Sequence, residues 1–373
     1  MKTKQKICRS CLLIVMLLVT QVTNATNIFW IASGPGDWSV PANWSTNTVP
    51  GPSDIVIFDG GGLGDCNINI NVDVAGIDIQ AGYTTGTITQ GANTMLIRLS
   101  GASFSGGIFT GGTADITVNS NFTLSGTSFT STSTVLLIKG TYTVSSGSFF
   151  HNSGTVKFTN GSTITGSHAV HNVEFNAAVN SNFTIASGTE LTIEGTLTIS
   201  GAGFARILTG TINAQGDILV TNTSFTSGGS ATLKIDGTAD QLFSNSGTAG
   251  QGRLPFINID KPSGTLTLSG IITAGTNWAY TQGIIDALTN NSTLFLNSGN
   301  TITGSHTLHN VEFNAAVNTN FTIASGTELT AEGTLTISGA GFARIFTGTI
   351  NAKGDILVTN TSFTSGGSAT LKI

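Results

Sequence analysis

Charged residues, cysteine and proline are all scarce in this chain. Asp, Glu, Lys and Arg together make up 9% of its 373 residues, and only 6 residues are proline. Two of the three cysteines lie at positions 8 and 11, so Cys66 has no intrachain partner in the rest of the chain. This excludes a disulfide framework there, and an apolar core and backbone hydrogen bonds must hold the fold. We expect Cys66 to be a small buried residue, because no histidine or basic residue stands near it in the sequence.

The N-terminal segment 1–25 predicts a secretory signal peptide. Four basic residues (Lys2, Lys4, Lys6 and Arg9) precede the apolar run 11–20, and small residues follow at 23–25. Removing this segment takes away four of the 14 basic and none of the 19 acidic residues, which leaves a net charge of −9. We therefore expect a secreted or cell-surface protein, with nucleic acid excluded as a partner by its acidic, sparsely charged surface. No later stretch reaches the length of a transmembrane helix.

One block of the chain occurs twice. Residues 162–235 recur as residues 300–373, so each residue number in the second copy exceeds its counterpart by 138. The two copies differ at seven positions: Ser162/Asn300, Ala169/Thr307, Val170/Leu308, Ser181/Thr319, Ile193/Ala331, Leu208/Phe346 and Gln215/Lys353. Only the change from Ile193 to Ala331 alters size strongly, so a local packing change is expected there.

A shorter period runs inside this long one. Segments of three to five residues with alternating apolar side chains recur about every 20 residues, and Gly, Ser, Thr and Asn fill the gaps. No stretch of ten or more residues after position 25 has helical periodicity. The pattern predicts an all-β fold, a parallel β-helix of about 16 coils over residues 54–373. The offset between the two copies is then expected to equal about seven coils, with the block copied in register.

Stacked coils place side chains one period apart above one another. The tripeptide Phe150-His151-Asn152 recurs as Val170-His171-Asn172. We therefore expect His151 to lie under His171, and Asn152 under Asn172 in a hydrogen-bonded ladder.

The region before the coils is rich in tryptophan and proline. Residues 26–53 contain Trp30, Trp38 and Trp44 and four of the 6 prolines. We interpret this segment as an N-terminal cap that shields the open edge of the first coil. The alternative is a glycan-binding site in which sugars stack on the three indole rings.

The spacing W-x7-W-x5-W-S, followed by Asp-Ile-Val-Ile-Phe at 54–58, resembles the start of secreted bacterial β-helix proteins. These include autotransporter-passenger-like and Bacteroidetes-type surface adhesin-like proteins. The resemblance covers only Trp30 to Phe58. It implies a right-handed parallel β-helix exposed at, or released from, the cell surface, often as an adhesin or stalk. It carries over no catalytic residues.

Two groups of histidine and glutamate are candidate metal ligands, one in each copy of the block. They are His168, His171 and Glu174, and His306, His309 and Glu312. Residues three apart on an extended strand point to opposite faces, so a structural role is the favoured interpretation. No cofactor is predicted.

A polysaccharide lyase or hydrolase would also suit a β-helix. The candidate carboxylate pairs are Asp73/Asp78, Glu190/Glu194 and Glu328/Glu332, with Arg206 and Arg344 as possible basic partners. A glycan- or ice-binding face could be built from Thr-x-Thr rows, but the seven occurrences are not spaced by one constant period. The hypothesis we favour is a non-catalytic surface scaffold of the adhesin type, with surface glycans or other cells as partners.

The second copy of the block stops at Ile373, whereas the first continues into further patterned sequence. We therefore expect the chain to be the N-terminal part of a longer protein.

Overall fold

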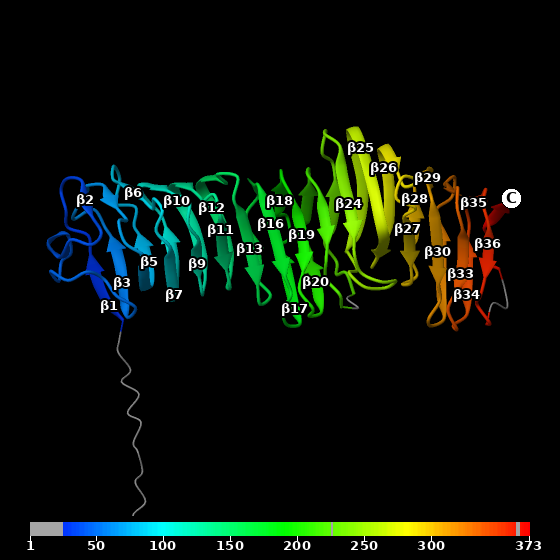
Figure 1. Ribbon diagram of the computed structural model, residues 1–373, viewed down its shortest axis with the longest axis horizontal. Helices are drawn as coiled ribbons and strands as arrows, with labels where there is room; N and C mark the ends of the chain where they lie inside the picture. Colours follow the sequence, from blue (N-terminus) through cyan, green and yellow to red (C-terminus); the bar gives the residue numbers. More distant parts are fainter. Residues whose placement is uncertain (1–24, 225–226, 363–365) are drawn as a thin grey trace, which may run out of the picture.

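The computed structural model describes residues 25–224, 227–362 and 366–373, so the predicted signal peptide lies outside it except for Ala25. The described chain is an all-β parallel β-solenoid of about 15 turns with about 21 residues in each. Its turns follow one another along a single axis, from β1 at one end to β36 at the other (Figure 1). The predicted all-β fold of stacked parallel coils is confirmed, with slightly fewer and longer coils than expected.

Each turn supplies up to three strands, and strands of successive turns pair in parallel to form three columns. Long strands bend around corners and belong to more than one column. Column 1 contains β1 (Thr26–Phe29), β3 (Asp54–Phe58), β5 (Val72–Ile79), β7 (Met95–Phe104), β10 (Phe122–Thr130), β12 (Tyr142–Phe150), β14 (Thr163–Thr165), β17 (Ser181–Ile185), β20 (Ala205–Leu208), the end of β25 (Phe256–Ala274), β27 (Thr293–Leu296), β30 (Asn310–Asn314), β33 (Leu335–Ser338) and β36 (Ile356–Val358).

Column 2 contains β2 (Gly36–Asp37), β4 (Cys66–Asn67), β6 (Thr87–Thr89), β8 (Ile108–Thr110), the ends of β10 and β12, β15 (His168–Val170), β18 (Glu190–Ile193), β21 (Thr211–Ala214), β23 (Thr232–Ile235), the start of β25, β26 (Trp278–Asp286), β28 (Thr301–Thr303), β31 (Thr319–Ile323) and β34 (Ala343–Phe346). Column 3 contains the starts of β5 and β7, β9 (Ile116–Val118), β11 (Val135–Ile138), β13 (Thr155–Thr159), β16 (Asn172–Asn176), β19 (Leu197–Ser200), β22 (Ile218–Val220), β24 (Gln241–Asn245), parts of β25 and β26, β29 (His306–Leu308), β32 (Glu328–Ala331), β35 (Thr349–Ala352) and β37 (Thr370–Lys372).

The core is a continuous stack inside the three columns. Alternate side chains of each strand point inward, so the apolar positions of one turn pack on those of the next. Phenylalanines form part of this stack: the rings of Phe109 and Phe129 lie 4.9 Å apart and nearly parallel, and Phe149 continues it at 5.7 Å from Phe129. The described residues contain one short 3₁₀ turn, η1 (Pro41–Asn43), and none of their helices has the length and apolarity needed to cross a membrane.

At the corners between columns, asparagine and aspartate side chains accept hydrogen bonds from the backbone of the next turn. Asn172 Oδ1 accepts a hydrogen bond of 2.8 Å from the N–H of Thr196, one turn later, and Asn310 does the same for Thr334. Asn121 and Asp240 make the corresponding bonds elsewhere in the stack. These bonds satisfy backbone groups where the strand ladder is interrupted.

The expected ladder of Asn152 and Asn172 is wrong. Asn172 pairs with Thr155 rather than with Asn152, because the corner after β12 is longer than the one after β15. That corner contains Asn152 and Ser153, both with positive φ. Asn152 donates instead to the backbone carbonyl of Ser131, at 3.1 Å.

The tryptophan-rich segment forms the first turn and also covers its outer edge. β1 pairs in parallel with β3, and on the other side the backbone groups of Phe29 and Ile31 bond to residues 43–45, which run antiparallel beside them. Trp30, Trp38 and Trp44 are at most 1% exposed and pack edge to face, with ring centres 4.8 to 5.0 Å apart. None of the three rings therefore offers the exposed face that a stacked sugar would need.

The second copy of the duplicated block is rotated by one column relative to the first. Six successive parallel pairings lead from β15 through β18, β21, β23, β25 and β26 to β28. β28 is the copy of β14, which lies in column 1, yet β28 lies in column 2 above β15. The offset is thus six turns plus one strand, and the expectation of about seven whole turns in register is wrong. The copied block keeps its alternation in the new column, because every column needs only an inward apolar face and polar corners.

The packing change expected at Ile193/Ala331 involves a second substitution. Val170 is the partner of Ile193 in the ladder, and Leu308 is the partner of Ala331. All four side chains are buried. The larger Leu308 therefore offsets part of the volume lost at Ala331.

Candidate functional site

The structure separates the predicted metal ligands of the first copy. His168 is turned inward: its Nε2 atom lies 2.9 Å from the Tyr142 hydroxyl and its Nδ1 atom 2.9 Å from the Gly166 carbonyl. Burial lowers the pKa of His168, which keeps the ring neutral. Both ring nitrogens are thus used inside the fold, so the candidate ligand His168 has no free nitrogen for a metal ion.

Glu174 belongs to a polar network on the outer face of column 3. Its carboxylate lies 2.9 Å from Lys157 Nζ and accepts hydrogen bonds from Ser200 (2.6 Å) and Asn176 (3.0 Å). Partial burial opposes ionisation of Glu174, but these donors outweigh it and lower its pKa. Glu174 is therefore a partner of its neighbours along the stack and does not face His168.

The second copy repeats this separation with a different aromatic partner. Trp278 Nε1 donates to His306 Nε2 at 2.9 Å, and His306 Nδ1 lies 2.8 Å from the Gly304 carbonyl. Burial lowers the pKa of His306 to about 4. Glu312 accepts a hydrogen bond from Ser338 at 2.5 Å. His306 and Glu312 are thus also structural residues.

A different trio comes together at the corner between columns 2 and 3. His151 follows β12, His171 follows β15 and Glu194 follows β18, so three successive turns each contribute one side chain. The rings of His151 and His171 are stacked with centres 5.3 Å apart, and His151 Nε2 lies 3.0 Å from Glu194 Oε2. Among the described residues, these three form the group of His, Cys, Asp or Glu whose ligand atoms all lie within 4.8 Å of one another. We call them the corner triad.

The corner triad combines one predicted ligand with two residues that the sequence did not assign to a metal. The stacking of His151 under His171 is confirmed. Glu194 was predicted as a partner of Glu190, but the two stand at opposite ends of β18. Glu194 follows His171 by one turn of the solenoid, and this spacing could have identified Glu194 from the sequence as a neighbour of the two histidines.

The same corner of the second copy is built differently. Thr289 stands at the position that corresponds to His151, so the first histidine is missing there. Glu332, the copy of Glu194, forms an ion pair of 2.8 Å with Lys353, at a position where the first copy has Gln215. The Nδ1 atom of His309 is buried without a hydrogen-bond partner. His309 is therefore present, but its acidic neighbour is neutralised by a lysine.

The carboxylate pairs proposed for catalysis are not brought together. Asp73 forms a two-pronged ion pair with Arg98, at 2.6 and 2.8 Å, on column 3, whereas Asp78 lies past the bend of β5 on column 1. Glu328 forms an ion pair of 2.6 Å with Lys372, at the end of β32 opposite to Glu332. The carboxylates in the predicted pairs thus have separate partners along the stack.

The predicted basic partners are also engaged. Arg206 lies over the ring of Phe204 and donates to Ser227 at 2.5 Å, and Arg344 lies over Phe342. Neither approaches the acidic residues with which it was grouped closely enough to form an ion pair.

The Thr-x-Thr segments are distributed over all three columns. Segments 87–89 and 301–303 lie in column 2, 196–198 and 265–267 in column 3, and the remaining three in column 1. Of these, 141–143 and 163–165 lie on successive turns, with Thr143 opposite Thr165. The segments therefore do not form one flat row.

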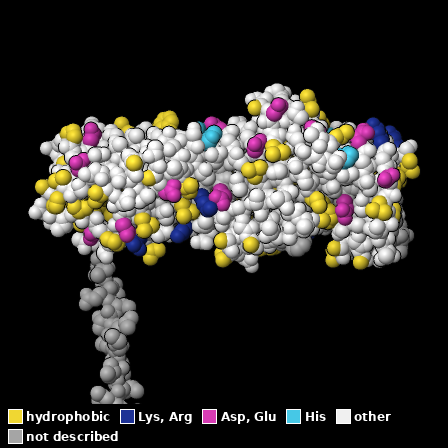
Figure 2. Space-filling view, viewed as in Figure 1, with side chains coloured by type: hydrophobic (Ala, Val, Ile, Leu, Met, Phe, Trp, Pro, Cys, Tyr) yellow, Lys and Arg dark blue, Asp and Glu magenta, His cyan; other side chains and the backbone are white. Residues whose placement is uncertain are grey.

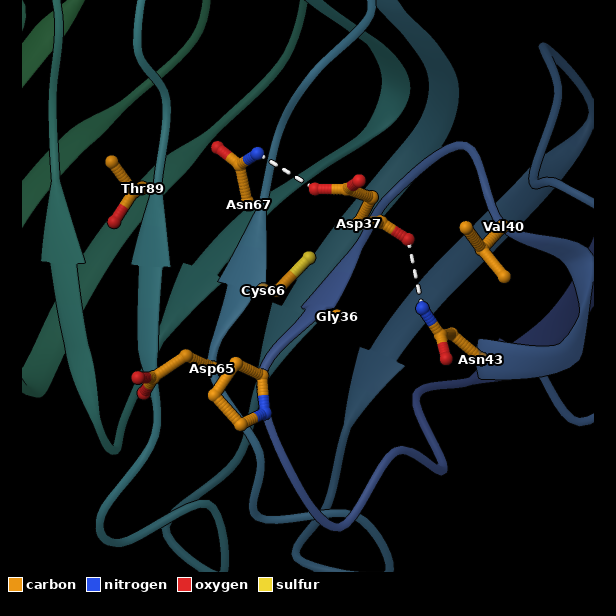
Figure 3. A pocket seen from close by; sticks show the side chains of 9 residues that line it. Gly36, Asp37, Val40, Asn43, Asp65, Cys66, Asn67 and Thr89 are labelled. Atoms are coloured by element: carbon orange, nitrogen blue, oxygen red, sulfur yellow. Dashed lines mark hydrogen bonds between the residues drawn. The ribbon is translucent and has the colours of Figure 1, made fainter.

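An open recess of about 540 Å³ lies on column 2 near the N-terminal end. Figure 3 shows Asp37 and Asn67 pointing toward each other from neighbouring strands, joined by a hydrogen bond of 2.7 Å. The Asp65 carboxylate does not join this pair, because it accepts a hydrogen bond of 2.9 Å from the backbone N–H of Thr87. Cys66 beneath the recess is 1% exposed, and burial, with a smaller effect of Asp37, raises the pKa of its thiol. Cys66 is thus the small buried residue that the sequence predicted.

The fold and these sites define a parallel β-solenoid protein whose polar side chains are organised along the stack. Comparison of the chain with protein-family models, curated proteins and solved structures finds no match.

Proposed function

We propose that the protein is an exported, non-catalytic scaffold of the adhesin type, secreted or held at the cell surface. The observation that carries this proposal is the uninterrupted stack of about 15 turns with one continuous core. Such a stack makes a rod in which each turn contacts only its neighbours, and it presents long repetitive faces to the outside. The resemblance of residues 30–58 to secreted bacterial β-helix proteins supports the same location and role.

The surface also favours this role. Figure 2 shows a face made mostly of uncharged side chains and backbone, with acidic and basic groups scattered over it. Half of the basic residues that follow position 25 are paired with carboxylates: Arg98, Lys157, Lys234, Lys353 and Lys372. Such a surface suits weak, repeated contacts with surface glycans or other cells and is poorly matched to nucleic acid.

The test is binding of the purified chain to cells and to immobilised glycans, with the soluble products analysed for released sugar. We expect binding without any release of sugar. Depolymerisation of a bound polysaccharide would contradict the proposal and support the enzymatic alternative.

A further inference from the structure

The corner triad brings together one side chain from each of three successive turns of the solenoid. Backbone bonds hold the corner in place: Glu194 N–H donates to the Val170 carbonyl at 3.0 Å, and Gly195 N–H donates to the His171 carbonyl at 2.8 Å. The side chains of His151 and Glu194 remain 29% and 45% exposed, so an ion can reach them from solvent. Backbone bonds therefore fix the corner, and the triad is accessible from solvent.

We propose that the corner triad binds one divalent transition-metal ion, of the kind represented by Zn²⁺. Two imidazole nitrogens and one carboxylate oxygen suit such ions, and a site with three protein ligands leaves positions for water. Bonds of about 2.0–2.2 Å place tetrahedral ligand atoms about 3.4 Å apart. His151 Nε2 and Glu194 Oε2 lie 3.0 Å apart, which is near this distance. The other ligand atoms are at most 4.8 Å apart, and rotation of the side chains, above all of the exposed Glu194, brings them closer.

Metal binding has one identifiable cost at His151. The Nδ1 atom of this ring accepts a hydrogen bond of 3.0 Å from the N–H of Ser153, so the neutral ring carries its proton on Nε2. An ion on Nε2 moves that proton to Nδ1, and the bond to Ser153 is lost. We therefore expect affinity in the micromolar range, weaker than that of a structural zinc site.

The duplicated block supplies a matched control within the same chain. At the corresponding corner Thr289 replaces the first histidine, and the Lys353 ammonium group lies 2.8 Å from Glu332. A cation there would lose one ligand and meet a positive charge. The chain should accordingly bind one ion and not two.

The experiment is calorimetric titration of the metal-free, full chain with Zn²⁺, supported by thermal unfolding with and without the ion. We expect one ion per chain. His151→Thr, which introduces the residue type found at Thr289, and Glu194→Gln should each weaken binding at least about tenfold, the size that loss of even an outer-shell partner causes. His309→Ala should leave binding unchanged.

Transfer of the site gives the second arm of the test. Thr289→His combined with Lys353→Gln should raise the stoichiometry from one ion to two. Absence of binding by the unaltered chain, or binding that survives both His151→Thr and Glu194→Gln in variants with unchanged circular dichroism, would overturn the proposal. The outcome is independent of the scaffold function, because a scaffold needs no metal.

Discussion

The duplicated block allows one side chain to be tested in two environments with the same local sequence. Leu233 and Leu371 both occupy the segment Ala-Thr-Leu-Lys-Ile. Leu233 is 1% exposed and lies between Ile212 of the preceding turn and Ile257 of the following one. Leu371 is 48% exposed and has only Ile350 on one side. We expect Leu233→Ala and Leu371→Ala to differ strongly in their effect on stability.

The magnitudes follow from burial. Truncating a fully enclosed leucine loses its transfer free energy and leaves a cavity, which costs about 3 kcal/mol. At Leu371 about half of the transfer free energy, roughly 1 kcal/mol, is at stake, and no enclosed cavity forms. Urea denaturation followed by far-ultraviolet circular dichroism gives the free energy of unfolding of each variant, with the slope m as a check on two-state behaviour. Equal losses would refute the reasoning, since they would show that strand propensity and not stacking sets the contribution of this leucine.

Three further predictions concern buried groups. His306 has a pKa of about 4, below its ordinary 6.5, so the unfolded chain takes up the proton first as pH falls. Between pH 7 and pH 5, the free energy of unfolding of the unaltered chain should therefore fall by about 2 kcal/mol more than that of His306→Phe, as measured by urea denaturation at each pH. Lys261, 1% exposed, donates through its ammonium group to acceptors of the preceding turn, so Lys261→Met should cost about 3 kcal/mol in the same assay, and an unchanged stability would contradict this role. Gly166 has φ of +93° and a Cβ there would collide with the Val144 carbonyl, so Gly166→Ala should lower the free energy of unfolding by more than about 2 kcal/mol; Gly188→Ala, with φ of +78° and open space around it, should cost only about 1 kcal/mol.

The alternation of apolar and polar residues was enough to predict the architecture. Each strand needs only an inward apolar face, and the period of about 20 residues places such faces above one another. The stacking of His151 under His171 followed from the same period and is confirmed. The aromatic partners of the two inward histidines, Tyr142 and Trp278, were not predicted, because they depend on which side chain of the preceding turn reaches the ring.

Corners limited what the sequence could predict. Additional corner residues shift the register: the corner after β12 has four residues, 151–154, whereas the corner after β15 has only His171. Strand propensity does not predict the length of a corner. The shift in register removed the expected asparagine ladder. The offset of the duplicated block was misjudged for a different reason: the six turns from His168 to Ile302 span 134 residues, which is more than the 20 per turn that the sequence predicted. The metal candidates were grouped by nearness in sequence, whereas the side chains that meet at the corner triad come from three different turns. A site on a solenoid must be sought along its axis, and this requires the exact length of each turn.

The rotation of the second copy by one column has a consequence for any feature carried by the block. A surface group copied with the block reappears six turns further along and about a third of the way around the axis. Repetition of the same step would wind the copied groups into a spiral and return them to the starting side after three steps. Duplication in this chain thus lengthens the rod and, at the same time, points the same chemistry in a new direction.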